Sequence, residues 1–164
     1  VQIQPPQPHL LKAIPLVRQG EYLFTEEFMK NMNLIVIFSN DMKKILMCKR
    51  AKDPYKNKYN FVGGKIEKEN DGLNEAYREL FEETGITKSD TCLTHFMNLS
   101  YIQHNINLEV YYGILEHDID LIEEVNTLKW ISSDENFFDM NRFAGEGNVG
   151  HIINEIMIYL NEKR

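Results

Sequence analysis

Three glutamates, Glu79, Glu82 and Glu83, are spaced so that they would share one face of a helix. In an α-helix of about 3.6 residues per turn, positions i, i+3 and i+4 lie side by side. Carboxylates this close repel one another, and a divalent cation would remove that repulsion. Hard cations such as Mg2+ prefer carboxylate oxygens and leave room for substrate phosphates to complete the shell. The spacing therefore predicts a metal site that handles phosphate oxygens.

The same residues could instead form an ordinary solvated face, with Arg78 paired to Glu82 at i, i+4. The surrounding sequence favours the metal site, because a Gly63-Gly64 pair precedes the helix and Gly85 follows it. The glycine pair permits close backbone approach, and Gly85 is where a left-handed C-terminal cap is expected.

The helix that must carry these residues is predicted from about Leu73 to Thr84, with Asn70 or Asp71 able to cap its start. Glu75 lies one further turn back on the acidic side. A second, mostly apolar stripe predicts the face that packs on the core; it comprises Leu73, Ala76, Tyr77, Leu80 and Thr84.

Residues 63–86 resemble the Nudix box. With Gly64 as its first glycine, the box places these residues in register: Arg78, Glu79, Leu80, Glu82, Glu83, Gly85 and Ile86. One position departs, because the early glutamate of the box falls on Asn70. In the family that glutamate mainly helps to orient the arginine. Asn70 could accept a hydrogen bond from Arg78 but brings no charge, and Glu69 could take the role if the loop is shifted by one residue.

The resemblance implies that Glu79, Glu82 and Glu83 bind Mg2+, with Mn2+ as an alternative. Glu83, the most central ligand, Glu82 and Arg78 are the expected catalytic residues of the box. A general base often lies outside the box in this family. We favour Glu124 or its neighbour Glu123, in the acidic loop before Trp130, over Glu109 on a strand. A loop glutamate can approach the metal without occupying core space. Plain surface solvation is the alternative for both loop residues.

Substrate binding is assigned to residues outside the helix. The segment Lys-Arg-Ala-Lys-Asp around Arg50 resembles MutT-like members, in which such an arginine contacts phosphates. Asn148 matches an asparagine that reads a purine edge, although it could equally cap the final helix. Gly64 and Lys65 complete the expected substrate contacts. Tyr101, Tyr111 and Phe143 could stack on a base, but each fits the core at least as well.

The resemblance therefore implies an enzyme, a hydrolase acting on phosphoanhydrides. Its expected substrate is a purine nucleoside triphosphate, including oxidised forms such as 8-oxo-dGTP, converted to monophosphate and pyrophosphate. The alternatives are an ADP-ribose, dinucleotide or nucleotide-sugar pyrophosphatase and, less favoured, a nucleotide sensor without catalysis.

The composition of the chain limits which classes of binding partner are expected. The net charge of −7 argues against a nucleic-acid polymer as partner. Cys48 and Cys92 lie in apolar stretches and are expected to be buried thiols. Neither a transmembrane segment nor a signal peptide is evident, so a cytoplasmic location is expected. The expected partner is a small-molecule nucleotide, and the expected state is a monomer or homodimer.

Residues 1–28 differ in composition from the rest of the chain, because they hold four of the five prolines and no methionine. We expect an N-terminal extension there, either foreign to the natural protein or a native arm, followed by a Nudix domain at 29–164. In that domain the hydrophobic pattern predicts strands, a short helix at 133–139 and a closing helix at 148–162. The expected strands are 34–39, 44–50, 59–62, 94–101, 108–115 and 127–131. The expected fold class is α/β, a Nudix-type α/β/α sandwich with a mixed sheet between helices.

Overall fold

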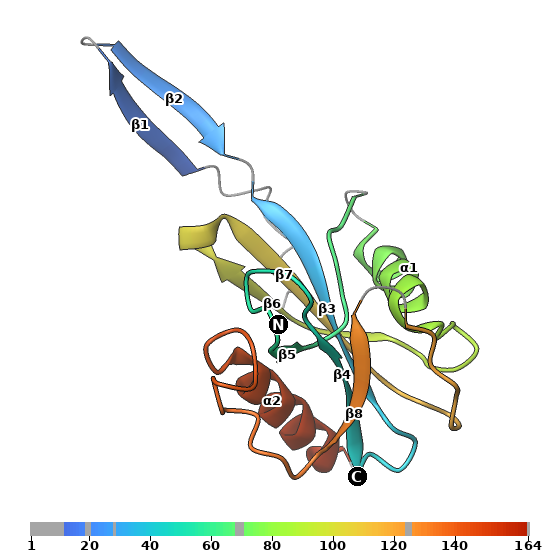
Figure 1. Ribbon diagram of the computed structural model, residues 1–164. Helices are drawn as coiled ribbons and strands as arrows, with labels where there is room; N and C mark the ends of the chain where they lie inside the picture. The colour runs from blue at the N-terminus through green and yellow to red at the C-terminus, as the bar shows by residue number, and fades with distance from the viewer. Residues whose placement is uncertain (1–11, 19–20, 28, 68–70, 124–125, 164) are drawn as a thin grey trace.

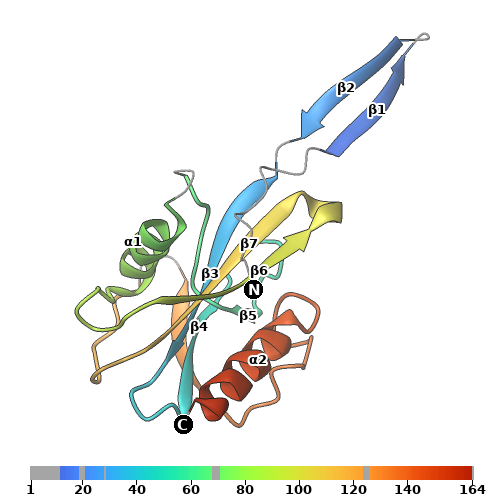
Figure 2. The ribbon, with the colours of Figure 1, turned by 180° about the vertical axis from the view of Figure 1, so that it is seen from behind.

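A six-stranded mixed sheet lies between two helices in the computed structural model of this protein (Figures 1 and 2). The structure describes residues 12–18, 21–27, 29–67, 71–123 and 126–163. Helix α1 (Gly72–Thr84) covers one face of the sheet and helix α2 (Asn148–Glu162) covers the other. The predicted α/β/α sandwich is confirmed.

The sheet is mixed because β3 and β7 run parallel, whereas the other pairs are antiparallel. Its order is β5-β4-β3-β7-β6, and β8 pairs with β4. The strands are β3 (Lys30–Phe38), β4 (Lys44–Lys49), β5 (Tyr59–Asn60), β6 (Thr94–Tyr101), β7 (Ile106–Ile114) and β8 (Thr127–Ser132). Each predicted strand is present, with ends shifted by at most a few residues.

The central strand β3 packs on both faces, which explains its unbroken apolar run. Alternate side chains point to opposite faces of a strand. Ile35 and Ile37 pack with Ala76 and Leu80 of α1 in one core cluster. Val36 and Phe38 belong to the other cluster, with side chains of α2. Helix α1 is therefore held firmly against the sheet.

Helix α1 follows its predicted range and ends as expected. Gly85 is left-handed, with a φ of 79°, and its N–H donates to the carbonyl of Phe81. Two details differ. Asp71 precedes the helix without a side-chain capping bond, and Leu73 is 45% exposed rather than part of the core stripe. Asn70 lies outside the described residues.

The short helix expected at residues 133–139 is wrong, because this segment forms turns. Side chains in and beside this segment accept nearby backbone N–H groups. Ser132 accepts from Asp134, Asn136 from Phe138 and Asp139 from Asn141. Such local bonds compete with helix formation.

The two cysteines differ in environment. Cys48 is 3% exposed, and burial raises the pKa of its thiol to about 12. Cys92 is exposed, so the expectation of a second buried thiol is wrong. Its neighbours Thr91 and Leu93 are both buried, and alternation along the chain turns the residue between them outward.

A separate two-stranded antiparallel sheet precedes the domain, formed by β1 (Lys12–Arg18) and β2 (Glu21–Glu27) (Figure 1). The predicted division at residue 28 falls between this hairpin and β3, and it remains a prediction. Within the described part of the chain, neither helix has the length and apolar character needed to cross a membrane.

Leu80→Ala should destabilise the fold by about 2–5 kcal/mol, because it opens a cavity at a fully buried site. The control is Leu73→Ala on the same helix, whose exposed side chain should matter by less than about 0.5 kcal/mol. Urea unfolding followed by circular dichroism measures both. Equal losses in the two variants would contradict the packing of α1 described here.

Candidate active site

The acidic face of α1 is organised by one guanidinium, that of Arg78. Its Nη1 donates to Glu82 at 2.7 Å, and its Nη2 donates to Glu79 at 2.6 Å and to Glu75 at 3.0 Å. Its Nε also reaches Glu75, at 3.3 Å. The Arg78–Glu82 pair, which the sequence offered as part of an alternative solvated face, is therefore present, but as one branch of a contact with three carboxylates.

The pKa values of Arg78 and Glu79 are both raised on this face, where charged side chains lie close together. The hydrogen bonding of Arg78 to the Glu75 carboxylate is the largest cause that raises the pKa of Arg78, and the charge of Glu79 adds to it. Burial raises the pKa of Glu79 above its ordinary value, and the charges of Glu82 and Glu75 raise it further against the opposing effect of Arg78. An added cation would relieve this repulsion.

The two glycines lie directly against the acidic face. The N–H of Gly63 donates to Glu83 Oε2 at 3.3 Å. A Cβ placed on Gly64 would lie 2.3 Å from the carboxyl carbon of Glu79, so only glycine leaves room for that carboxylate. The structure thus brings Gly63 and Gly64, from the loop after β5, together with Glu79 and Glu83.

Asn33 on β3 fixes this glycine turn through two hydrogen bonds to Gly64. Its Oδ1 accepts the N–H of Gly64 at 2.9 Å, and its own backbone N–H donates to the Gly64 carbonyl at 2.9 Å. Asn33 is fully buried, and its Nδ2 has no hydrogen-bond partner among the described residues. Asn33 was not among the site residues predicted from the sequence; the available signal was an amide directly before the apolar run of a strand.

Glu75 is the other residue whose role was missed. The helical repeat placed it on the acidic side, but gave it no function. Its side chain is 5% exposed, and its Oε2 accepts from Arg78 and from the backbone N–H of Glu67 at 3.2 Å. A buried carboxylate requires such partners.

The described side chains do not converge into a ready metal centre: no group of three His, Cys, Asp or Glu among them is close enough to hold an ion. Arg78 draws Glu79 and Glu82 to different branches of its guanidinium. The donors nevertheless fit a hard divalent cation, since all are carboxylate oxygens and one arginine cannot neutralise them all.

Arg50 follows β4 and lies in the same region. Its charge and that of Glu83 both act on the pKa of Cys48, although burial dominates there. The Nε of Arg50 is buried and has no hydrogen-bond partner within the described structure. Lys65 directly follows the glycine turn and is exposed, whereas the next residue, Ile66, is buried.

Asn148 begins α2 and is not its N-cap, because Gly147 occupies that position with a φ of 92°. The alternative role as a capping residue is therefore wrong. The loop before Asn148 is tied to the loop after β4, since Tyr55 donates from its hydroxyl to the Glu146 carboxylate at 2.7 Å. Of the candidate stacking rings, Tyr111 and Phe143 are core residues and Tyr101 is half-buried.

The three candidates for a general base, Glu124, Glu123 and Glu109, differ in where they lie and what they contact. Glu124 lies outside the described residues. Glu123 accepts the backbone N–H of Leu128 at 2.7 Å, which gives it a structural task. Glu109 accepts the Tyr111 hydroxyl at 2.6 Å and lies against Gly72, at the start of α1. The hydrogen bonds of these two described candidates go to Leu128 and Tyr111, and none goes to the glycine turn.

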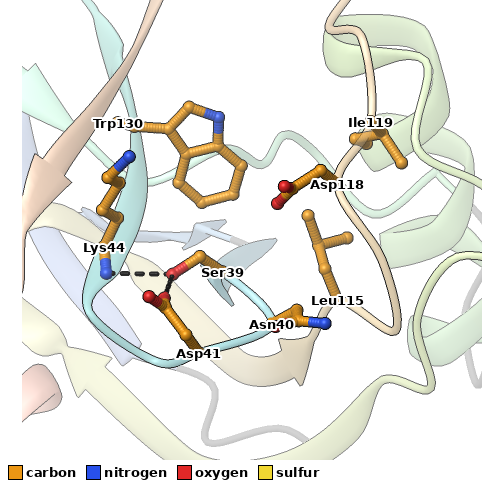
Figure 3. Close-up of a pocket in the computed structure, with 8 residues that line it drawn as sticks. All are labelled: Ser39, Asn40, Asp41, Lys44, Leu115, Asp118, Ile119 and Trp130. Carbon is orange, nitrogen blue, oxygen red and sulfur yellow. Dashed lines mark hydrogen bonds between the residues drawn. The ribbon is translucent and has the colours of Figure 1, made fainter.

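A cavity of about 370 Å3 lies elsewhere, at the turn between β3 and β4 (Figure 3). It contains none of the predicted site residues; its lining is Ser39, Asn40, Asp41, Lys44, Leu115, Asp118, Ile119 and Trp130. Ser39 donates to Asp41 and accepts the backbone N–H of Lys44, so these polar groups stabilise the turn.

Comparison with known proteins decides the family, because the NUDIX domain matches residues 29–147. The chain belongs to the NUDIX family. This match includes the glycine turn, the acidic face of α1, Arg50 and the loop up to Gly147. No curated protein matches the chain. The Nudix resemblance seen in the sequence is confirmed, and so is the predicted class of enzyme, a hydrolase acting on phosphorus-containing anhydrides.

Several solved structures of other proteins have the same fold. A MutT structure for the Aliivibrio salmonicida and Vibrio cholerae proteins is 24% identical, has a TM-score of 0.57, and covers 77% of this chain and 98% of its own. A C. elegans Ap4A hydrolase is 18% identical, with a TM-score of 0.64 and coverages of 80% and 98%. The NUDIX domain of Shewanella oneidensis NrtR, complexed with ADP ribose, is 14% identical, with a TM-score of 0.65 and coverages of 82% and 90%.

Gly64→Ala should weaken Mn2+ binding by about tenfold, because the added methyl group must displace the Glu79 carboxylate. Free Mn2+ measured by electron paramagnetic resonance reports the affinity. The control is the same change in a Glu79→Ala background, where no carboxylate remains to be displaced and the added methyl group should have little further effect. A full additional loss in that background would show that the glycine serves another purpose.

Proposed function

We propose that this Nudix hydrolase is Mg2+-dependent and cleaves a purine nucleoside triphosphate to its monophosphate and pyrophosphate, with oxidised forms such as 8-oxo-dGTP among its substrates. The observation that carries the proposal is the close approach of Gly63 and Gly64 to the carboxylates of Glu83 and Glu79. That arrangement holds the Glu79 and Glu83 carboxylates against the backbone of the glycine turn.

Glu79, Glu82 and Glu83 would hold the ion, with Mn2+ as a substitute for Mg2+. The ion supplies charge neutralisation at the phosphates and a polarised water. Glu124 is proposed as the group that takes the proton from the attacking water. Arg78 balances the carboxylates of the helix, so that negative charge on the substrate can approach.

Arg50 is proposed as a phosphate contact. Its buried Nε has no hydrogen-bond partner among the described residues, and a guanidinium fork suits phosphate oxygens. Gly64 and Lys65 would lie beside the same phosphates. Asn148 is proposed to read the base, because it starts α2 without capping it and an amide can donate and accept at once.

A second candidate is a pyrophosphatase for ADP-ribose, a dinucleotide or a nucleotide sugar. It is favoured by similar structures that include an Ap4A hydrolase and a NUDIX domain complexed with ADP ribose. A sensor without catalysis is less favoured, since the chain keeps Glu79, Glu82 and Glu83. In either case the proposed partner is a small nucleotide, bound by a cytoplasmic monomer or homodimer.

Glu83→Gln should reduce Mg2+-dependent turnover by about 10²–10³-fold, the usual cost of removing one group that stabilises charge in the transition state. Pyrophosphate release is measured over a Mg2+ and Mn2+ series with nucleoside triphosphates, canonical and oxidised. Glu155→Gln, an exposed carboxylate change on α2, is the control and should keep full activity. Undiminished turnover in Glu83→Gln would remove Glu83 from the metal site.

Asn148→Ala should lower kcat/KM for the preferred purine nucleotide by about tenfold or more while leaving a pyrimidine nucleotide unaffected, because it removes an amide that pairs with the base. The measurement compares kcat/KM across canonical and oxidised nucleoside triphosphates, ADP-ribose, NADH and a nucleotide sugar. Uniform loss across all bases, or no change, would remove Asn148 as a base reader.

A further inference from the structure

Glu75 differs from the other carboxylates that contact Arg78 in how deeply it is buried. Its side chain is 5% exposed, against 15% for Glu79 and 47% for Glu82. Burial restricts the directions in which a carboxylate can turn. Glu82 can swing toward solvent or toward another cation, whereas Glu75 is enclosed by the protein.

Glu75 also has the fullest contact with the guanidinium. It accepts from both Nε and Nη2 of Arg78, while Glu79 and Glu82 each accept from one terminal nitrogen. A further donor, the backbone N–H of Glu67, holds the same Oε2 from the loop before the helix. Charge-assisted bonds that use two nitrogens of a guanidinium fix its orientation more strongly than single bonds do.

We propose that Glu75 is a positioning residue that anchors Arg78 on the helix, so that Glu79 and Glu82 can exchange their bonds to Arg78 for a divalent cation. The anchoring of Arg78 does not depend on the proposed function. The exchange of Glu79 and Glu82 from Arg78 to a cation rests on the proposed metal-dependent function. A buried carboxylate that keeps the arginine prevents the arginine from competing with the cation for the other two.

Glu75 also supplies a charge that the sequence lacks at its usual place. The early glutamate of the Nudix box is replaced by Asn70, which lies outside the described residues. Glu75 provides a negative charge to the same arginine from within the helix, three residues before it. The departure at position 70 therefore does not leave Arg78 without a buried acidic partner.

The anchor is tested first without metal, by nuclear magnetic resonance. In Glu75→Gln a neutral acceptor replaces the charged one, and exchange of the Arg78 Nε–H with water should accelerate by about tenfold, with the Glu67 amide affected as well. Asp71→Asn is the matched control. It removes one negative charge at the start of the same helix, from a side chain that bonds Asn74 and not Arg78. Equal exchange rates in Glu75→Gln and wild type would overturn the anchor.

The second test adds the cation. When Mg2+ is added to wild type, the Arg78 Nε–H should stay as slowly exchanging as before; acceleration on Mg2+ binding would overturn the proposal. This measurement needs no variant, so it decides the question even if Glu75→Gln does not fold. Mn2+ affinity, measured from the free-ion signal, should fall by about tenfold in Glu75→Gln and by less than about twofold in Asp71→Asn. Equal losses of Mn2+ affinity in the two variants would show that only the removed negative charge matters, and would overturn the positioning role of Glu75.

The two proposals fail in different ways. A wild-type protein that binds neither Mg2+ nor Mn2+ would overturn the proposed metal-dependent function. The exchange rates in the metal-free protein would still decide whether Glu75 anchors Arg78.

Discussion

Electrostatic repulsion among the glutamates of α1 is the constraint on which the site depends. Arg78 donates to three carboxylates at once, and its hydrogen bonding to Glu75 contributes most to raising the pKa of Arg78. One positive charge cannot neutralise this many negative ones, and Glu79 is partly buried, so its pKa is raised. The helix therefore keeps excess negative charge in a partly enclosed place. That is an arrangement in which a divalent cation is stabilising, because it removes the repulsion that folding imposes.

The sheet determines where this charge is held. Helix α1 is fixed to one face by Ala76 and Leu80, which pack on alternate residues of β3. On the same strand, Asn33 makes two hydrogen bonds to Gly64 and so fixes the glycine turn. Strand β3 therefore positions both halves of the site, the helix and the turn. The lack of a Cβ at Gly64 lets these halves approach until the Glu79 carboxylate occupies the vacant position.

The two residues proposed to contact the substrate, Arg50 and Asn148, lie where loop segments meet β4 and α2. Arg50 follows β4 with a buried, unpartnered Nε among the described residues, and Asn148 opens α2 behind the positive-φ Gly147. The Tyr55–Glu146 bond joins the two loops across the chain. Loops carry substrate recognition in many folds because a rigid scaffold can hold different loops.

The sequence by itself determined the family, the layered fold and the range of nearly every element, because these follow from local periodicity and from a long motif with fixed spacing. It failed where local and tertiary preferences compete. Residues 133–139 form turns because their side chains capture backbone N–H groups, and Leu73 is exposed although its helical spacing fits the core. Only the tertiary structure showed that Glu75 is buried against Arg78 and that Asn33 holds Gly64. Burial and contacts between distant segments depend on how helix and sheet pack, and spacing along one helix does not contain that information.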